Sequence, residues 1–325
     1  MRKLLATVLV VAGVVAPQVA ARAQDYPSRT ITIVVPFSAG GPTDTVTRLV
    51  AEAMQRDLGQ QIVVENVGGA GGTVGAGRVA KAEPDGHTLL LYHIGLATSA
   101  TLYRNLAFNP REAFAPIGLV TEVPMTIVAR ADLPPKDVQE LVSYVKENKD
   151  TVTYANAGIG AASHLCGMLF MREIGTQLTT VPYKGTGPAL TDLIGGQVDF
   201  MCDQTTNTTN QIKAGKIKIY AVTSPERLNV LPDAPTTLEA GLSGVQVSIW
   251  HGLYAPKGTP DAVVQRLAAS LQKALKDENV IQRFAELGTT PVDESAATPE
   301  ALTARLNSEI DRWAPVIKEA GVYAD

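Results

Sequence analysis

The chain of 325 residues has little cysteine, few aromatic residues and no excess of positive charge. Its two cysteines and four histidines form no CxxC pair, no His-Glu-x-x-His and no other metal-ligand spacing, so we expect neither a metal site nor a cofactor. The 28 basic residues are outnumbered by 32 acidic ones. A nucleic-acid partner requires a basic face, so we expect no nucleic-acid binding. Beyond the N-terminal segment no run of about 18 apolar residues occurs, so we expect no membrane-spanning helix.

The two cysteines, Cys166 and Cys202, leave two possibilities open. In an exported protein they can form one disulfide. The alternative is a pair of buried thiols that pack as small apolar side chains. Spacing alone does not decide between them, because a disulfide depends on the geometry of both backbones.

The N-terminal segment is typical of a secretory signal peptide. Arg2 and Lys3 precede an apolar run over residues 4–16, and Ala21-Arg22-Ala23 fits the small-x-small cleavage pattern. The apolar run is too short to cross a bilayer as a stable helix. We therefore expect a signal peptide at 1–23, cleavage after about Ala23, and a periplasmic mature chain without a lipid anchor.

Short β-branched runs alternate with helical patterns along the chain, which predicts an α/β fold with largely parallel sheets. The length suits two domains. Strands are expected at residues 31–36, 61–65, 88–92, 117–121, 125–130, 152–155, 179–182, 198–202, 218–223 and 246–254. Helices are expected at residues 43–58, 74–81, 96–103, 137–146, 163–174, 187–195, 206–214, 235–240, 260–276, 278–287 and 299–320.

A strand-to-helix turn at residues 36–44, which we name the first elbow, is the most informative segment. Small residues let a ligand approach the backbone, and Pro42 is typical of a first helical turn. Free amides at a helix N-terminus form an anion site without any lysine or arginine. The candidate ligand-binding residues here are Phe37, Ser38, Ala39, Gly40, Gly41, Thr43 and Asp44.

A second strand-to-helix turn, the second elbow, covers residues 158–164, just after Asn156. A Gly/Ala turn again leads into a helix, with Ser163 as the predicted N-cap. Two such elbows suggest two lobes that hold opposite ends of one small molecule. The candidate residues here are Asn156, Gly158, Gly160, Ala161, Ala162, Ser163 and His164.

A third loop, residues 203–210, is dense in uncharged hydrogen-bonding side chains. It is either a polar helix N-terminus capped by Asp203 or Thr205, or a set of donors that orients the far end of a ligand. Two further positions also leave alternatives open. The segment from His93 to Gly95 either lines the cleft or packs inside the first lobe, and Tyr183 is a candidate for the cleft wall.

Several linked motifs resemble the substrate-binding proteins of tripartite tricarboxylate transporters, the Bordetella uptake gene (Bug) family. The resemblance extends over essentially the whole mature chain. The segments that carry it are Tyr26 to Asp44, Glu65-Asn-Val-Gly-Gly-Ala-Gly-Gly-Thr-Val-Gly75, Pro84-Asp-Gly-His-Thr-Leu89, Pro182-Tyr-Lys-Gly185, Gly195-Gly-Gln-Val-Asp199, Leu231-Pro-Asp-Ala-Pro-Thr236 and Ala255-Pro-Lys-Gly-Thr-Pro260.

This resemblance implies a type II periplasmic-binding-protein fold with two lobes, crossover strands and a central ligand cleft. The first lobe would comprise 24–124 and 248–325, the second 125–247, with crossings near 122–126 and 245–250. The implied function is capture of a small organic carboxylate and its delivery to TctA- and TctB-like membrane subunits, without chemistry on the ligand. A monomer is expected.

The resemblance also implies roles for particular residues. The first elbow would hold the ligand carboxylate, partly through ordered waters, and Ser163 would be a direct donor from the second lobe. Asp203 occupies the position that meets an ammonium group in amino-acid-binding members. A purely anionic ligand is favoured at least as much as one with an ammonium group, because the neighbouring residues are Thr205, Thr206 and Asn207. Tricarboxylates, dicarboxylates such as adipate, aromatic carboxylates such as terephthalate, and amino or nicotinic acids all remain open.

Three rival interpretations follow from the residues. A dinucleotide-binding loop would use the glycine-rich segment 68–77. The segment does not match the G-x-G-x-x-G pattern, because Val74 stands where the third glycine belongs. A secreted hydrolase would use Ser163 and His164, although no Gly-x-Ser-x-Gly elbow exists and adjacent residues rarely point at each other. A receptor that serves only a sensor is the third possibility.

Overall fold

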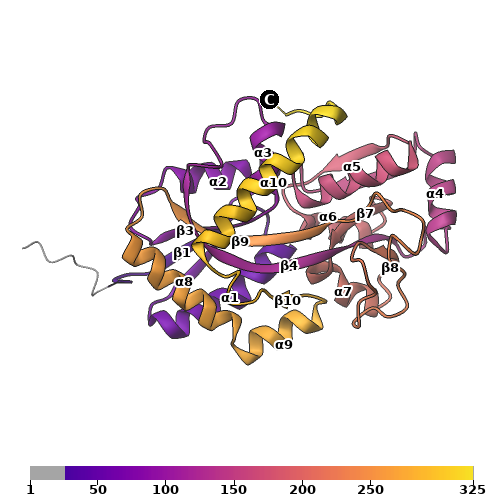
Figure 1. The fold of residues 1–325 in the computed structure, drawn as a ribbon. Helices are drawn as coiled ribbons and strands as arrows, with labels where there is room; N and C mark the ends of the chain where they lie inside the picture. The colour runs from indigo at the N-terminus through magenta and orange to yellow at the C-terminus, as the bar shows by residue number, and fades with distance from the viewer. Residues whose placement is uncertain (1–25, 325) are drawn as a thin grey trace, which may run out of the picture.

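The computed structural model describes residues 26–324, so the expected signal peptide at 1–23 lies outside the described residues. These residues form an α/β protein in which helices flank a long, twisted sheet (Figure 1). None of the helices in this part of the chain has both the length and the apolar character that a bilayer crossing requires.

The first part of the sheet has the strand order β2-β1-β3-β9-β4. Strand β1 runs parallel to β2 and β3, whereas β9 is antiparallel to both β3 and β4. The carboxyl ends of β1 and β3 therefore point to the same edge of the sheet. The strands are β1 (Ile31–Val35), β2 (Ile62–Asn66), β3 (Thr88–His93), β4 (Phe114–Arg130), β9 (Ser248–Pro256) and the short β10 (Thr290–Pro291), which pairs with β4.

The second part repeats this pattern in the order β6-β5-β7-β4-β8. Strand β5 is parallel to β6 and β7, and β4 is antiparallel to β7 and β8. In this repeat, the carboxyl ends of β5 and β7 correspond to the carboxyl ends of β1 and β3 in the first part. The strands are β5 (Thr153–Asn156), β6 (Thr179–Pro182), β7 (Phe200–Gln204) and β8 (Ile217–Val222).

Strand β4 joins the two parts. The sequence predicts two strands at 117–121 and 125–130, which is wrong, because β4 is continuous for 17 residues. Its partner changes in mid-strand: Pro124 pairs with β9 and Met125 with β7. A proline has no backbone N–H to donate, so it disturbs the hydrogen bonds of the sheet least where the strand changes partner. The expected crossing at 122–126 coincides with this change, and the lobe boundaries themselves remain a prediction.

Two helical layers cover the first part of the sheet (Figure 1). Helices α1 and α8 pack together on one face with α9 nearby, and α10 lies on α3 and β4 on the other. The face of α1 and α8 buries Val46, Leu91, Leu253, Leu267 and Phe284 in one hydrophobic core. The helices are α1 (Pro42–Leu58), α2 (Thr73–Ala80), α3 (Gly95–Leu102), α4 (Val138–Glu147), α5 (Ala162–Ile174), α6 (Thr186–Ile194), α7 (Thr205–Lys213), α8 (Asp261–Leu275), α9 (Glu278–Glu286) and α10 (Pro299–Ala320).

The helix expected at 235–240 is wrong. Thr236 and Glu239 form a reciprocal capping box, with Glu239 N donating to Thr236 Oγ1 (3.0 Å) and Thr236 N donating to Glu239 Oε2 (2.7 Å). Gly241 follows with a left-handed φ of +76°. The capping box that would begin a helix is formed, but the chain makes only a single turn because Gly241 adopts a helix-ending conformation.

The two cysteines form a disulfide between α5 and β7. Cys166 and Cys202 are 0% and 1% exposed, so the bond lies inside the core of the second part of the sheet. Of the two possibilities that the sequence leaves open, the structure contains the disulfide.

Asp57, at the end of α1, joins α1 to α8. Its carboxylate lies 2.6 Å from Arg266 and 2.7 Å from Lys273. Burial raises the pKa of Asp57, but the hydrogen bonds from Lys273 and Arg266 outweigh it and bring the pKa to about 2. Because this pKa lies below that of the unfolded chain, the carboxylate stabilises the fold above about pH 4, and the contribution is lost as pH falls through about 2.

We therefore expect Asp57→Asn to lower the free energy of unfolding at pH 7 by about 1–2 kcal/mol, after a discount for the exposed lysine. The difference from the wild type should vanish near pH 2. Urea unfolding across this pH range measures it. Glu52→Gln, an exposed carboxylate on the same helix, is the matched control and should change little. An equal effect of both variants would contradict the assignment.

Candidate functional site

The first elbow leads from β1 into α1, as the sequence predicts. The helix begins at Pro42, in the first helical position, after an extended Gly41. Gly40 has a φ of +79° and its amide donates to Asp44 Oδ2 over 3.0 Å. This left-handed turn favours glycine, which has no Cβ to clash with the backbone.

Asp44 holds the elbow in place. Its buried carboxylate also accepts from Arg48 Nε (3.0 Å) and from Asn66 Nδ2 (3.0 Å), and Asn66 in turn donates to Phe37 O (3.1 Å). Burial raises the pKa of Asp44, but the hydrogen bonds from Arg48, Gly40 and Asn66 together lower it. The carboxylate therefore stays ionised and engaged with its own lobe, which suits a positioning residue.

The elbow presents free donors. Within residues 26–324, no hydrogen bond engages the backbone amides of Gly41 and Thr43. The Thr43 hydroxyl lies 3.4 Å from His251 Nε2 on β9. A helix N-terminus with unused amides attracts an anion.

His251 and His93 form an uncharged pair behind the elbow. Their ring centroids are 5.8 Å apart, and Phe37 stacks on His93 at 4.7 Å. His93 Nδ1 accepts from the amide of Gly95 over 2.9 Å. Burial lowers the pKa of His251 to about 3 and the pKa of His93 well below its usual value. Both rings are therefore neutral at pH 7, and His93 and Gly95 are linked to Thr43 through His251.

The second elbow leads from β5 into α5. Ser163 is not the N-cap, because the helix begins at Ala162 and Ala161 is the capping residue, without a side-chain bond. The Ser163 hydroxyl instead accepts from Ala157 N over 2.9 Å and Asn156 Oδ1 accepts from Gly158 N over 2.8 Å. The polar side chains at this elbow stabilise its own loop.

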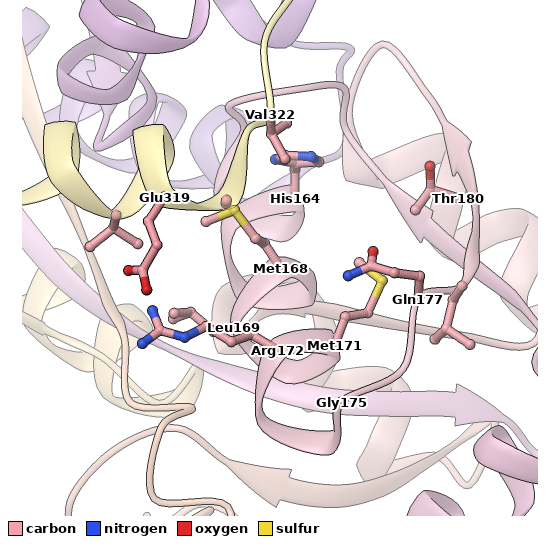
Figure 2. Close-up of a pocket in the computed structure, with 13 residues that line it drawn as sticks. His164, Met168, Leu169, Met171, Arg172, Gly175, Gln177, Thr180, Glu319 and Val322 are labelled. Atoms are coloured by element: carbon pink, nitrogen blue, oxygen red, sulfur yellow. The ribbon is translucent and has the colours of Figure 1, made fainter.

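Ser163 and His164 do not form a catalytic pair. His164 Nδ1 accepts from Gly160 N over 3.3 Å, and no hydrogen bond joins the two side chains among the described residues. Burial lowers the pKa of His164 to about 4. Its ring lines a separate pocket between α5 and α10 (Figure 2). The hydrolase interpretation therefore has no geometric support.

The third loop opens α7. Neither Asp203 nor Thr205 caps this helix, because Gln204 is the capping residue and Thr205 is its first residue. Asp203 accepts from Gln204 N (2.8 Å) and from Asn207 Nδ2 (2.5 Å), and Thr205 Oγ1 donates to Gly288 O (3.2 Å). Burial raises the pKa of Asp203 to about 6, although hydrogen bonds from Asn207 and Gln204 act to lower it.

Glycines let the two lobes touch at the first elbow. Ser38 N donates to Lys184 O over 3.0 Å. A Cβ on Gly187, in the first turn of α6, would stand 2.7 Å from Ala39 O and 3.1 Å from Gly41 N. The first elbow and the start of α6 therefore meet backbone to backbone.

The second elbow makes the matching contact. Tyr103 donates to Ile159 O over 2.8 Å and Thr98 Oγ1 donates to Gly160 O over 3.1 Å. A Cβ on Gly71, where φ is +60°, would stand 2.0 Å from Ile159 O. The glycine-rich segment thus serves close packing between the lobes, which are in contact on both sides of the site.

Several buried polar side-chain atoms have no hydrogen-bond partner within the described residues. His251 Nδ1 lies behind the first elbow, and the others are on His87, Gln204, Thr206, Trp250, Tyr254 and Ser270. Trp250 and Gln204 occupy register positions opposite Glu122 and Met125 of β4, on either side of the change of partner. Unsatisfied buried polar groups are rare and call for an explanation.

Sequence reasoning missed His251 and Gly187, which lie against the first elbow. His251 lies opposite His93 because β3 and β9 pair in antiparallel fashion, and no local sequence pattern predicts this pairing. The hydroxyl of Tyr183 donates to Asp192 Oδ2 over 2.7 Å, and the place of Tyr183 in the cleft wall stays a prediction. Within residues 26–324 no three His, Cys, Asp or Glu side chains are placed to hold a metal ion.

Gly40→Ala should disturb the donors of the first elbow. An alanine forced to a φ of +79° costs about 1–2 kcal/mol, which favours a rotated elbow, and we expect about tenfold weaker ligand binding. Gly59→Ala is the matched control, because Gly59 has a φ of +68° at the other end of α1 and neither glycine has an atom within 4 Å of the added Cβ. Calorimetry should find binding unchanged in Gly59→Ala, and equal affinities in both variants would contradict the role of the elbow.

Comparison with known proteins identifies the family of this chain. The family model of the tripartite tricarboxylate transporter family receptors (TctC) matches residues 46–322. A UPF0065 protein of Agrobacterium vitis, from the TAR-I ttuE-ttuC' intergenic region, is 58% identical over 302 residues, 93% of this chain and 87% of that protein. BugT of Bordetella pertussis is 34% identical over 326 residues, 99% of this chain and 98% of that protein.

Solved structures agree with the fold. The periplasmic binding protein BugD superimposes with a TM-score of 0.90 at 53% identity, over 92% of this chain and 100% of that chain. MatC from Rhodopseudomonas palustris, with bound malate, has a TM-score of 0.87 at 45% identity, over 90% and 100%. Rpa4515 from the same organism, with adipate, has a TM-score of 0.87 at 33% identity, over 92% and 99%.

These matches confirm the expected family and the two-lobed periplasmic-binding-protein fold. The family model covers most of the chain, and both curated relatives exceed 30% identity over nearly its full length. The repeated strand order in the two parts of the sheet agrees with them. The chain therefore belongs to the tripartite tricarboxylate transporter family receptors, the solute-binding proteins that include the Bug proteins.

Proposed function

We propose that this chain is a periplasmic receptor that captures a small organic dicarboxylate between its lobes and delivers it to the membrane subunits of a tripartite tricarboxylate transporter. The observation that carries the proposal is the first elbow, where no hydrogen bond engages the amides of Gly41 and Thr43 within the described residues and the buried His251 Nδ1 behind them has no partner. Each such atom costs about 1–3 kcal/mol when it is left unsatisfied. A polar ligand, with its ordered waters, removes this cost.

The chemistry of the elbows favours an anion. The unused amides at the start of α1 carry partial positive charge from the helix dipole, and no lysine or arginine is needed beside them. MatC and Rpa4515 hold malate and adipate, which each carry two carboxylates. We assign one carboxylate to the amides of Gly41 and Thr43 and the other to the second lobe.

Lobe closure would complete the site. In the open form the ligand meets the first elbow, and closure adds the start of α6, the third loop and the second elbow around Ser163. The interlobe contacts of Ser38, Tyr103 and Thr98 then stabilise the closed form. In this proposal Asp44 and His93 position the elbow, and the other candidate residues remain predictions.

Asp203→Asn tests the charge of the ligand. Burial raises the pKa of Asp203 to about 6, so its carboxylate is ionised at pH 8 and protonated at pH 5. A dicarboxylate meets a like charge at pH 8, and we expect the variant to bind malate about fivefold more tightly there. At pH 5 the variant and the wild type should agree. Calorimetry measures both, and weaker malate binding at both pH values would contradict this reading of Asp203.

A ligand panel tests the binding function. Malate, succinate, adipate, citrate, terephthalate, nicotinate and aspartate are compared by thermal shift, because a ligand that binds only the folded state raises the melting temperature with its concentration. We expect the dicarboxylates to give the largest saturable shifts, with no loss of ligand by chromatography. Absence of any carboxylate shift would refute capture, and turnover would refute the receptor assignment.

An uptake assay tests delivery. A strain lacking the receptor should take up labelled dicarboxylate slowly and recover when the wild-type chain is supplied. Retained binding in vitro without any uptake defect in the deletion strain would contradict delivery to the permease and favour a receptor that serves a sensor.

A further inference from the structure

A second pocket lies outside the elbows, between α5 and α10, and we name it the α5–α10 pocket. Its volume is about 690 Å³, within the usual range of about 300–1,000 Å³ for small-molecule sites. One wall is α5 with the segment that follows it, from His164 to Thr180. The other wall is the end of α10 with Val322 (Figure 2).

The lining combines an apolar floor with one charge on each wall. Met168, Met171 and Leu178 supply flexible apolar surface that adapts to an occupant. Arg172 stands on the α5 wall and Glu319 on the α10 wall, and Figure 2 shows the two charged groups pointing toward one another. No ion pair joins them within the part of the chain that the structure describes.

We propose that the α5–α10 pocket is a second ligand site for an amphipathic zwitterion, whose carboxylate pairs with Arg172, whose ammonium pairs with Glu319 and whose apolar group covers the methionines. A purely anionic amphiphile would meet Glu319 as a like charge, and a cation would meet Arg172. Only a molecule with both charges complements both walls.

Occupancy of this pocket also acts on the arrangement of the lobes. Helix α10 packs on α3 and β4, whereas α5 packs against β5 and β7, so an occupant bridges elements of the two parts of the sheet. His164 lines the pocket while its Nδ1 accepts from Gly160 of the second elbow over 3.3 Å. A ligand in the pocket therefore stabilises the arrangement of lobes described here.

An isosteric set of probes tests the proposal. L-phenylalanine carries both charges, 3-phenylpropionate lacks the ammonium and 2-phenylethylamine lacks the carboxylate. We expect L-phenylalanine to raise the melting temperature of the wild type in a saturable way, and each analogue to bind at least tenfold more weakly. Equal binding of all three probes, or no saturable binding of L-phenylalanine, overturns the proposal.

Matched variants locate the site. Arg172→Gln and Glu319→Gln should each weaken L-phenylalanine binding at least tenfold, while Lys318→Gln, beside Glu319 but not in the pocket lining, should leave it unchanged. Ala320→Trp should fill the pocket and abolish binding from an exposed position in the last turn of α10, where it does not disturb the core.

Competition separates this site from the cleft. L-phenylalanine should still bind when malate is saturating. If it instead competes with malate and ignores the three pocket variants, it occupies the cleft and the second site is refuted, while the proposed receptor function stands. If malate does not bind at all, the proposed function fails, and the three variants still decide the second site.

Discussion

Gly187→Ala is expected to weaken dicarboxylate binding about a hundredfold without unfolding the protein. The added Cβ would stand 2.7 Å from Ala39 O, 3.0 Å from Gly40 C and 3.1 Å from Gly41 N. All three atoms belong to the backbone of the first elbow and have no rotamer by which to yield. Such overpacking costs up to about 3 kcal/mol, which corresponds to roughly a hundredfold in affinity when the cost falls on the closed form.

The same substitution should not lower the stability of the open form. Gly187 lies inside α6 and is not among the residues with positive φ, and alanine is the better helix former there by up to about 1 kcal/mol. Small-angle scattering should find a larger radius of gyration in the presence of malate than for the wild type. Calorimetry measures the affinity, and the melting temperature without ligand checks the fold.

Gly195→Ala is the control at the other end of α6. Gly195 has a φ of −77°, and the nearest atom to its added Cβ is 3.4 Å away within the same helix. It should bind malate as the wild type does. Wild-type affinity in Gly187→Ala would sink the proposal that the first elbow and α6 close on the ligand.

Loss of the disulfide is expected to give the largest change in stability. Cys166 and Cys202 are 36 residues apart in sequence, and closing a loop of this length stabilises the fold by about 4 kcal/mol in the chain-entropy model. We expect Cys166→Ala/Cys202→Ala to lower the free energy of unfolding in urea by about 3–4 kcal/mol. Malate affinity should stay within about threefold, because the bond lies in the core of one lobe.

Reductant supplies the control for this experiment. Dithiothreitol should destabilise the wild type toward the level of the double variant and leave the double variant unchanged. A double variant that unfolds within about 1 kcal/mol of the wild type would contradict a stabilising role, which rests on the loop-closure model. Chromatography of both proteins confirms that they remain the same size.

Much of the fold is predictable because its signals are local. Pro42 starts α1 and the β-branched run from Ile31 to Val35 forms β1, as the sequence predicts. The errors occur where tertiary contacts override a local signal. Pro124 suggests a break but lies inside β4, where the strand changes partner. The capping box of Thr236 and Glu239 forms only a single turn, which Gly241 ends before a helix develops.

The candidate site divides in the same way. The elbows of Gly40 and Ser163 are found from small residues between a strand and a helix, since that pattern has a backbone cause. The roles of the polar side chains cannot be predicted from such a local pattern. Asp44 and Asp203 are chemically suited to contact a ligand, yet their carboxylates are used by neighbouring groups of their own lobe.

The sequence by itself determined the family, most of the order of strands and helices, and the two elbows, because these follow from periodicity, turn residues and ordered motifs. Only the tertiary structure decided that Cys166 and Cys202 pair and that His251 reaches Thr43. It alone brings Gly187 against the first elbow and opens the pocket between α5 and α10. These features join residues far apart in the chain, and their distances depend on how strands pair and lobes meet, which no local pattern records.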